Sequence, residues 1–333
     1  MLPWVHRVDA SVFARGDRSS SATDAHEEPQ EQRSTAARTQ PGDGEGMDHT
    51  ARRRLLAVSR HLAQPRPAAE GRPQRFEGKH CLVTGAGSGF GLRTAELFAE
   101  EGAAIIYLVD RRQDRLDSAA AAISERGARA VTICADLGVM EECAQVMDTA
   151  LATHERLDVL VSNAAAWADE AFTEISDESW RHVLSVNLDA YFALSKRAAV
   201  AMKKTGGGSI LFTSSVDSVG HGRGFTSYCV AKAGLLSLCK AIAVECAPDN
   251  IRCNCVSPGP ADTQQSTDIV GTELMDKWRA NGFPAVPMNR LASTDDIAEA
   301  FLFLASDAAQ YISGINLPVD GALLAQAYDV PDE

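Results

Sequence analysis

Apolar runs and amphipathic stretches alternate along the chain from Phe76 onward. The runs are short and bounded, as is typical of buried strands, and stretches of helical length separate them. The expected strands are His80–Thr84, Ile105–Val109, Ala130–Cys134, Leu157–Ser162, Ser209–Thr213, Ile251–Val256 and Ile315–Val319. The expected helices fall near 89–101, 112–126, 140–154, 177–203, 226–247 and 294–305. This alternation predicts parallel βαβ units, and hence one α/β domain with helices on both faces of a doubly wound parallel sheet of about seven strands.

Residues 1–75 differ in character from this domain. They are rich in Arg, Ser, Gln, Pro, Ala and Gly and lack sustained apolar periodicity, so we expect a disordered extension before a catalytic domain at 76–333. They also lack the continuous apolar stretch of a secretory signal. A dispensable tail, or a start codon chosen too far upstream, is favoured. A mitochondrial leader starting at Met47 and a partner-docking helix after it are the open alternatives.

Charge and cysteine usage exclude several classes of partner. The net charge of −13 argues against nucleic acid and anionic membranes, which need concentrated Lys and Arg. No run approaches the roughly 18 apolar residues of a membrane span. The eight cysteines include no Cys-x-x-Cys pair and no neighbouring histidine cluster, so we expect no metal site. Cys253 and Cys255 would share one face of a strand, and buried reduced thiols are favoured over a disulfide, in keeping with a cytoplasmic location.

A glycine-rich segment, Thr84-Gly85-Ala86-Gly87-Ser88-Gly89-Phe90-Gly91, joins the first expected strand to the first helix. Glycines let the backbone approach a pyrophosphate closely, and the N–H groups that open the helix favour an anion. Such a run is weak support alone, but its place between a strand and a helix strengthens it. The expected dinucleotide contacts in this segment are Gly85, Ser88, Gly89, Phe90 and Gly91.

The second expected strand leads to Asp110, where a carboxylate can accept hydrogen bonds from ribose hydroxyls and repels a 2′-phosphate. Asp110 therefore favours NAD over NADP. Arg111 and Arg112 follow at once and keep NADP open, because guanidinium groups bind phosphate well. Capping of the next helix is the alternative role for Asp110.

Two further strand ends should face the same crevice, because open α/β sheets bind ligands at the carboxyl ends of their strands. Asp136 and Leu137 follow the third strand, and we expect them at the adenine; capping of the next helix is the alternative for Asp136. Asn163 follows the fourth strand, where the small residues Ala164–Ala166 would let a cofactor lie against the backbone.

Tyr228 and Lys232 are four residues apart on an expected helix, so their side chains should leave it on one face. A tyrosine with an ordinary pKa of about 10 is a poor base at neutral pH, and a neighbouring ammonium favours its phenolate. Ser215 stands thirteen residues before Tyr228 at a strand end and could hold a substrate oxygen. A Tyr-x-x-x-Lys pair often arises by chance, but Ser215 makes proton transfer by Tyr228 the favoured interpretation.

Taken together, these motifs resemble the short-chain dehydrogenase/reductase family over roughly Phe76 to Ala325. Thr84-Gly85-x-x-x-Gly89-x-Gly91 is similar to the family's cofactor loop, and Ser215, Tyr228 and Lys232 match its catalytic triad. The resemblance implies a Rossmann-type fold. It also implies that Asn187 is a fourth catalytic residue, which kinks a helix and holds a water linked to Lys232.

The same resemblance implies contacts with the nicotinamide half of the cofactor. Lys232, beside Tyr228, would also bind the ribose there. The loop that contacts the carboxamide would supply Pro258, Gly259, Ala261 and Thr263. Ser162-Asn163-Ala164-Ala165 departs from the family's Asn-Asn-Ala-Gly, and Ala165 crowds the cofactor more than glycine would. Family members commonly form dimers and tetramers through the helices that correspond to 177–203 and 226–247.

Substrate preference depends on the surrounding segments. Trp167 could form an apolar wall or simply pack, and Asp217, Ser218 and His221 follow the catalytic serine as candidates for the pocket. Residues 264–290 resemble the family's flexible substrate lid, and long irregular segments are often functional. The apolar residues Met275, Trp278 and Phe283 would either cover a modest apolar substrate or anchor this lid.

The favoured function is NAD-dependent oxidoreduction of a small-molecule secondary alcohol or ketone. An NADPH-dependent 3-oxoacyl-thioester reductase is the second enzymatic candidate. A nucleotide-sensing protein without turnover is the third candidate, and the complete set of Asn187, Ser215, Tyr228 and Lys232 argues against it.

Overall fold

A single parallel sheet of seven strands forms the centre of the computed structural model, which describes residues 73–152 and 154–326. The strand order is β3-β2-β1-β4-β5-β6-β7. The strands are β1 (His80–Thr84), β2 (Ile105–Asp110), β3 (Arg129–Cys134), β4 (Val159–Ser162), β5 (Gly208–Thr213), β6 (Ile251–Pro258) and β7 (Asn316–Val319). The predicted α/β class and the doubly wound sheet of about seven strands are confirmed.

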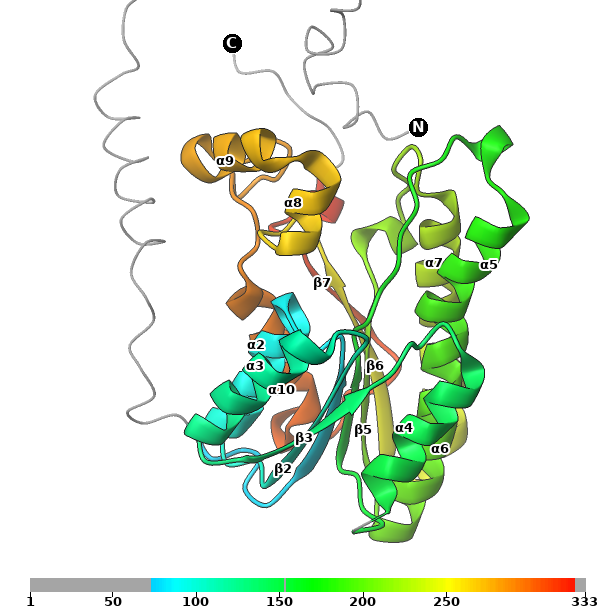
Figure 1. The fold of residues 1–333 in the computed structure, drawn as a ribbon, viewed down its shortest axis with the longest axis vertical. Coiled ribbons are helices and arrows are strands. Elements are labelled where there is room, and N and C mark those ends of the chain that lie inside the picture. The colour runs from blue at the N-terminus through cyan, green and yellow to red at the C-terminus, as the bar shows by residue number, and fades with distance from the viewer. Residues whose placement is uncertain (1–72, 153, 327–333) are drawn as a thin grey trace, which may run out of the picture. The chain divides into compact units, whose positions relative to one another are not determined.

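Helices cover both faces of this sheet. The helices are α2 (Gly89–Glu100), α3 (Gln113–Glu125), α4 (Met140–Leu151), α5 (Asp177–Leu184), α6 (Ala190–Thr205), α7 (Thr226–Cys246), α8 (Gln264–Val270), α9 (Thr272–Asn281) and α10 (Thr294–Ala305). Figure 1 shows α2, α3 and α10 on one face and α4, α6 and α7 on the other, with a separate apolar core under each set. Most strands are therefore buried on both faces, which is why they read as continuous apolar runs in the sequence.

The strand order reverses at the middle of the sheet. The chain runs outward from β1 through β2 to β3 and then returns to place β4 on the other side of β1. The carboxyl ends of β1 and β4 consequently lie side by side, and the connections that follow them diverge. This reversal creates the crevice in which ligands of open α/β sheets bind.

The described part of the chain begins just before β1. Arg75, which the sequence assigns to the extension, donates from Nε to Glu101 Oε2 at 2.5 Å, and Phe76 packs edge-on against Phe98 with ring centroids 4.7 Å apart. The remaining expectations for the extension, including the leader and the docking helix after Met47, fall on residues 1–72 and lie outside the described residues.

The helical stretch expected over 177–203 is confirmed, with a π turn at Ser185–Asp189 between α5 and α6. One expectation needs correction. The irregular segment expected over 264–290 contains α8 and α9. The Thr263 hydroxyl caps α8 by accepting from Ser266 N at 3.1 Å, and glycines with positive φ follow both helices. The mixed polar and apolar composition concealed these short helices because neither buries a full apolar face.

All eight cysteines are free thiols. Cys253 and Cys255 are both fully buried in the core beneath α7, which confirms that they share one face of β6. Within residues 73–152 and 154–326, no three His, Cys, Asp or Glu side chains gather closely enough to hold a metal ion. None of the helices in these ranges is long and apolar enough to cross a membrane.

Candidate functional site

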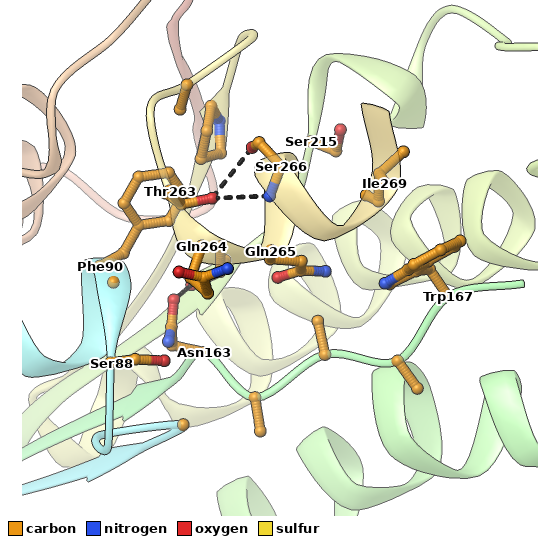
Figure 2. Close-up of a pocket in the computed structure, with 18 of the residues that line it drawn as sticks. Ser88, Phe90, Asn163, Trp167, Ser215, Thr263, Gln264, Gln265, Ser266 and Ile269 are labelled. Carbon is orange, nitrogen blue, oxygen red and sulfur yellow. Dashed lines mark hydrogen bonds between the residues drawn. The ribbon is translucent and has the colours of Figure 1, made fainter. Parts of the chain in front are cut away.

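A cavity of about 760 Å³ opens at the carboxyl ends of the strands, within the size range of ligand pockets. Nearly all of the expected cofactor residues line it, although they come from segments far apart in the sequence. These are Gly85, Ser88, Gly89, Phe90, Asp110, Arg111, Asp136, Leu137, Asn163, Tyr228, Lys232, Pro258, Gly259, Ala261 and Thr263. Figure 2 shows Ser88 and Asn163 on one side of this cavity, and Phe90 beside Thr263 near the start of α8.

The glycine-rich loop has the backbone geometry that phosphate binding requires. Gly85 and Gly89 have φ values of 63° and 56°, in the left-handed region that favours glycine. Ser88 precedes α2 and makes no side-chain capping bond, so the first N–H groups of α2 have no partner from a capping side chain. A pyrophosphate at this helix end would receive both these donors and the positive end of the helix dipole.

Gly91 belongs to the predicted cofactor loop but lies behind the cavity wall. It does not line the cavity, and a Cβ atom built there would lie 2.3 Å from the Gly85 carbonyl oxygen and 2.7 Å from Asn163 Nδ2. Gly91 therefore allows α2 to pack closely against the loop and β4. It shapes the glycine-rich loop without lining the cavity.

The carboxylate of Asp110 is held at the edge of the cavity. Its Oδ2 accepts from Gly87 N at 3.1 Å and its Oδ1 accepts from Arg112 N at 3.0 Å. Arg112, rather than Asp110, is the N-cap residue of α3, so the capping alternative for Asp110 is wrong. Arg115 also lines the cavity and donates to Ser88 Oγ at 3.2 Å. Its position in the first turn of α3 was the only sequence signal for this missed residue.

The capping alternative for Asp136 is also wrong. Asp136 Oδ1 accepts from Gly138 N at 2.8 Å and so stabilises the turn after β3, whereas Val139 is the N-cap residue of α4. Asp136 lines the cavity together with Leu137. The carboxylate is therefore placed where an adenine could reach it.

Asn163 connects three strand ends. Its backbone N donates to Thr84 Oγ1 at 2.8 Å, and its Nδ2 donates to the Thr84 carbonyl at 3.2 Å. Its Oδ1 accepts from Thr213 Oγ1 at 3.0 Å. β1, β4 and β5 are thus fixed relative to one another directly below the cavity.

The Lys232 side chain is fully buried at the base of the cavity. Its Nζ donates to the Thr213 carbonyl at 2.8 Å and to Tyr191 Oη at 3.4 Å, and it lies 5.4 Å from the centre of the Tyr228 ring. Tyr228 and Lys232 therefore lie on one face of α7. Burial lowers the pKa of Lys232 to about 7, because the ammonium has lost its water.

The pKa of Tyr228 lies above its ordinary value, chiefly because of burial and further because of the Asp217 carboxylate, while a hydrogen bond with Ser215 opposes the rise. This is the opposite of the lowering that the sequence predicts from Lys232. The physical reason lies in the environment of the cation. With a pKa of about 7, Lys232 is only partly charged at neutral pH, and its ammonium is directed at the Thr213 carbonyl.

Ser215 stands at the start of a 3-10 turn, Val216–Ser218, directly after β5. Its Oγ accepts from Asp217 N at 3.0 Å and donates to Asp217 Oδ2 at 3.2 Å. The preceding residue, Ser214, donates from Oγ to the Lys232 carbonyl at 3.1 Å. This bond ties the end of β5 to α7 and brings Ser215 beside Tyr228.

Asn187 lies in the π turn and is fully buried. Its Nδ2 donates to the Ala166 carbonyl at 2.6 Å and to the Val183 carbonyl at 2.8 Å. Its Oδ1 is buried and has no hydrogen-bond partner among the described residues, so it can still accept one. Asn187 does not line the cavity itself. The π turn is the break in the helix that the resemblance implied.

Tyr191 was missed by the sequence reasoning. It lies one helical turn after Asn187, donates to the Ala164 carbonyl at 3.0 Å and accepts from Lys232 Nζ. Burial raises its pKa well above the ordinary value, so its hydroxyl keeps its proton. The i, i+4 spacing from Asn187 was the available signal.

The other end of the cavity is lined by Trp167, Asp217 and Phe225, and by Met275, Trp278 and Phe283 of the expected lid. Figure 2 shows Gln265 and Ile269 of α8 on the side of Trp167, with Ser215 nearby. Two candidates lie elsewhere. His221 is exposed, and the Ser218 hydroxyl donates to the Ser215 carbonyl at 2.6 Å. Neither residue lines the cavity.

Comparisons with known proteins agree with this geometry. The sequence model of a family described as enoyl-(acyl carrier protein) reductase matches residues 85–323. A short-chain type dehydrogenase/reductase of Sinorhizobium fredii is 37% identical over 75% of this chain and 98% of its own length. The 3-oxoacyl-(acyl-carrier-protein) reductase of Thermotoga maritima is 33% identical over 75% of this chain and 99% of its own. The crystal structure of L-sorbose reductase from Gluconobacter frateurii, complexed with NADPH and L-sorbose, is also similar, with a TM-score of 0.71 and 32% sequence identity. The match covers 77% of this chain and all of the reductase chain.

Proposed function

The chain belongs to the short-chain dehydrogenase/reductase family and is a nicotinamide-dependent oxidoreductase of alcohol and ketone groups, and from this premise we propose that Tyr228 moves the proton of a secondary alcohol or ketone. The observation that carries this proposal is the convergence of Ser215, Tyr228 and Lys232 at one end of a cavity whose other end carries the glycine loop. A nucleotide sensor would have no need of this arrangement.

Each side chain has a defined task in the proposed reaction. During ketone reduction, the Tyr228 hydroxyl donates its proton to the substrate oxygen, and during alcohol oxidation its phenolate accepts that proton. Ser215 Oγ holds the same oxygen by a hydrogen bond. The bound nicotinamide supplies or accepts the hydride.

Lys232 and Asn187 support this proton transfer. The Lys232 ammonium has three protons, two of which are directed at Thr213 and Tyr191, so one is left for the ribose that the family resemblance implies. When protonated, Lys232 also favours the phenolate of Tyr228. The buried Asn187 Oδ1 is available to accept a hydrogen bond from a water that links Asn187 to Lys232.

The residues that line the cavity fit a dinucleotide. The left-handed glycines and the open start of α2 suit the pyrophosphate, and the Asp110 carboxylate stands where it would accept bonds from a ribose. NAD is the proposed cofactor, because Asp110 would repel a 2′-phosphate. Arg111, Arg112 and Arg115 line the same end of the cavity and favour NADP, because a guanidinium could pair with that phosphate.

A 3-oxoacyl thioester is the second candidate substrate. The similarity to the Thermotoga maritima reductase supports it, and so do the apolar lid residues Met275, Trp278 and Phe283 that line the cavity. An acyl chain would require apolar surface of this kind along its length.

A cytoplasmic homodimer or homotetramer is the proposed form of the protein. Apolar side chains are exposed on α6 and α7, including Phe192 at 49%, Val200 at 59% and Val244 at 76%. Exposed apolar groups on neighbouring helices are typical of a protein interface.

The proposed function is tested by incubating the protein with NAD or NADP and a panel of sugars, polyols, hydroxysteroids and hydroxyacyl thioesters, and following the absorbance of the reduced nicotinamide. We expect turnover of at least one secondary alcohol. Cofactor binding without turnover of any panel member would favour the nucleotide sensor.

A further inference from the structure

Asp217 places a carboxylate in the substrate end of the cavity, two residues after Ser215. Its Oδ2 accepts from the Ser215 hydroxyl at 3.2 Å. Burial raises the pKa of the Asp217 carboxyl, while the bonds from Ser215 and Gly222 N–H and the nearby His221 oppose this rise. The proton transfer proposed above does not use this carboxylate. Its presence in a partly dehydrated site therefore needs its own explanation.

The supply of hydrogen-bond donors to Asp217 changes when substrate binds. The Ser215 hydroxyl has only one proton, and donating it to a substrate oxygen takes it away from Asp217. Substrate also displaces water from the cavity. Asp217 then keeps the Gly222 N–H but loses the donor to Oδ2 and the water around it. A buried carboxylate oxygen without a donor is strongly disfavoured, so a matching substrate must bring a donor of its own to Oδ2.

The charged side chains that line the cavity limit which substrate groups can bind next to Asp217. Arg111, Arg112 and Arg115 line the end that contains Asp110, and His182 lies beside Gly138 of the turn after β3. The remaining cation among the described lining residues is Lys232, which is directed at Thr213. A substrate carboxylate next to Asp217 would therefore meet repulsion that no cation of the lining offsets, since His221 lies near Asp217 but outside the cavity lining.

The walls around Asp217 suit a small carbon skeleton that carries hydroxyl groups. Trp167 and Phe225 lie with ring centroids 6.4 Å apart and tilted by 57°, and they form an apolar surface. Gln265 of α8 points into the cavity on the same side as Trp167, where its amide can bond a further hydroxyl (Figure 2). A few polar groups in an apolar pocket fix the orientation of a ligand.

We propose that Asp217 selects the substrate by accepting a hydrogen bond from a hydroxyl on the carbon next to the reacting one, so that the enzyme acts on uncharged vicinal diols and α-hydroxy ketones. This inference rests on the proposed function and deepens it. Simple alcohols and 3-oxoacyl thioesters carry no such hydroxyl and leave Asp217 Oδ2 without a donor. Substrates with a carboxylate at this position are repelled.

The oxidation of a vicinal diol changes only the reacting carbon and its oxygen. The C–H bond of the reacting carbon breaks and its electron pair leaves with the hydrogen as hydride to the oxidised nicotinamide. The O–H proton passes to the Tyr228 phenolate, and the C=O bond forms. The neighbouring hydroxyl remains bonded to Asp217 throughout and is unchanged.

The test compares butane-2,3-diol with 2-butanol, which lacks only the second hydroxyl, in the wild type, Asp217→Ala and Asp177→Ala. Asp177 is an exposed carboxylate on α5 and serves as the matched control. We expect kcat/KM of the wild type to favour the diol by about 10- to 100-fold, the range that one hydrogen bond to a charged group supports. Asp217→Ala should bring this ratio close to one, and Asp177→Ala should keep the wild-type ratio.

A carboxylate substrate gives the complementary result. We expect the wild type to oxidise 3-hydroxybutyrate poorly and Asp217→Ala to oxidise it better relative to 2-butanol. Loss of activity by the same factor on the diol and on 2-butanol in Asp217→Ala would overturn the inference, because Asp217 would then only position Ser215. That outcome would leave the proposed function intact.

A measurement of diol binding tests the role of Asp217 independently of whether the protein turns over an alcohol. Diol binding is followed by tryptophan fluorescence in Tyr228→Phe saturated with NAD, and again in the double variant with Asp217→Ala. We expect Asp217→Ala to weaken diol binding about 10-fold or more and to leave 2-butanol binding unchanged. Equal binding of the diol to both variants would overturn the inference, even if the wild type oxidised no alcohol at all.

Discussion

Lys232 Nζ donates a hydrogen bond of 2.8 Å to the carbonyl oxygen of Thr213, the last residue of β5. This bond ties the middle of α7 to the sheet and fixes the distance between Lys232 and the Tyr228 ring. It also places an ammonium in a fully buried position, where burial lowers the pKa of Lys232 to about 7. The arrangement has consequences for stability as well as for proton transfer.

The stability of the cofactor-free protein should rise between pH 7 and 9. Lys232 has an ordinary pKa of 10.5 when unfolded and a pKa of about 7 when folded, so between these values the unfolded chain binds more protons. Each pH unit above 7 should add up to about 1.4 kcal/mol to the free energy of unfolding, and below pH 7 this contribution is constant. Urea denaturation at several pH values measures the slope.

Lys232→Met should remove this part of the slope, and the exposed Lys204→Met should retain it. A slope that is the same in the wild type and Lys232→Met would show that the folded pKa of Lys232 is not lowered.

Asp217→Asn should shift the pH dependence of alcohol oxidation to lower pH. Oxidation needs the Tyr228 phenolate, so kcat/KM falls as the pH drops below the pKa of Tyr228. The Asp217 charge raises that pKa, and its removal should lower it by about one unit. The acid limb of the normalised kcat/KM profile for one fixed substrate measures the shift. A shift toward higher pH would contradict the electrostatic role assigned to Asp217.

Asp110→Ala should reduce the preference for NAD. The wild type should have a higher kcat/KM with NAD than with NADP, because the Asp110 carboxylate bonds the ribose and repels a 2′-phosphate. Removing it should change the NAD/NADP ratio of kcat/KM by about 10-fold or more toward NADP. Arg115→Ala is the matched comparison and should lower NADP use. A wild type that already prefers NADP would refute the ribose argument.

Arg75→Ala should destabilise the protein by about 1–2 kcal/mol, because Arg75 donates two hydrogen bonds to the buried Glu101 carboxylate and is itself about a quarter exposed. Chemical denaturation measures the loss. Arg181→Ala, which removes an exposed pair with Asp177, should change stability very little. Equal effects of the two substitutions would show that the Arg75–Glu101 pair adds no more stability than an exposed ion pair.

The sheet could be predicted from the sequence because its strands are buried on both faces. β1 has the predicted bounds, His80–Thr84. Each of the other strands differs from its predicted range at one end only, by one or two residues. The π turn around Asn187 was implied by the family resemblance and could not be predicted from periodicity, because periodicity is judged over several turns and the added residue disturbs only one of them.

The missed parts of the site depend on tertiary contacts. Tyr191 and Arg115 reach the site through side-chain hydrogen bonds whose partners are far away in the sequence. The raised pKa of Tyr228 reflects burial, which the spacing of Tyr228 and Lys232 does not encode. Spacing places side chains on a common face, but the dielectric environment depends on what packs around them.

Proton transfer by Tyr228 is the central claim, and Tyr228→Phe tests it most directly, because this substitution removes only the hydroxyl. Turnover should be measured on the alcohol that the wild type oxidises best, together with the Kd for NAD. We predict that kcat falls by about 100- to 10,000-fold, the contribution of one general acid–base group, while the Kd for NAD changes little. Turnover equal to that of the wild type would contradict the assignment of Tyr228.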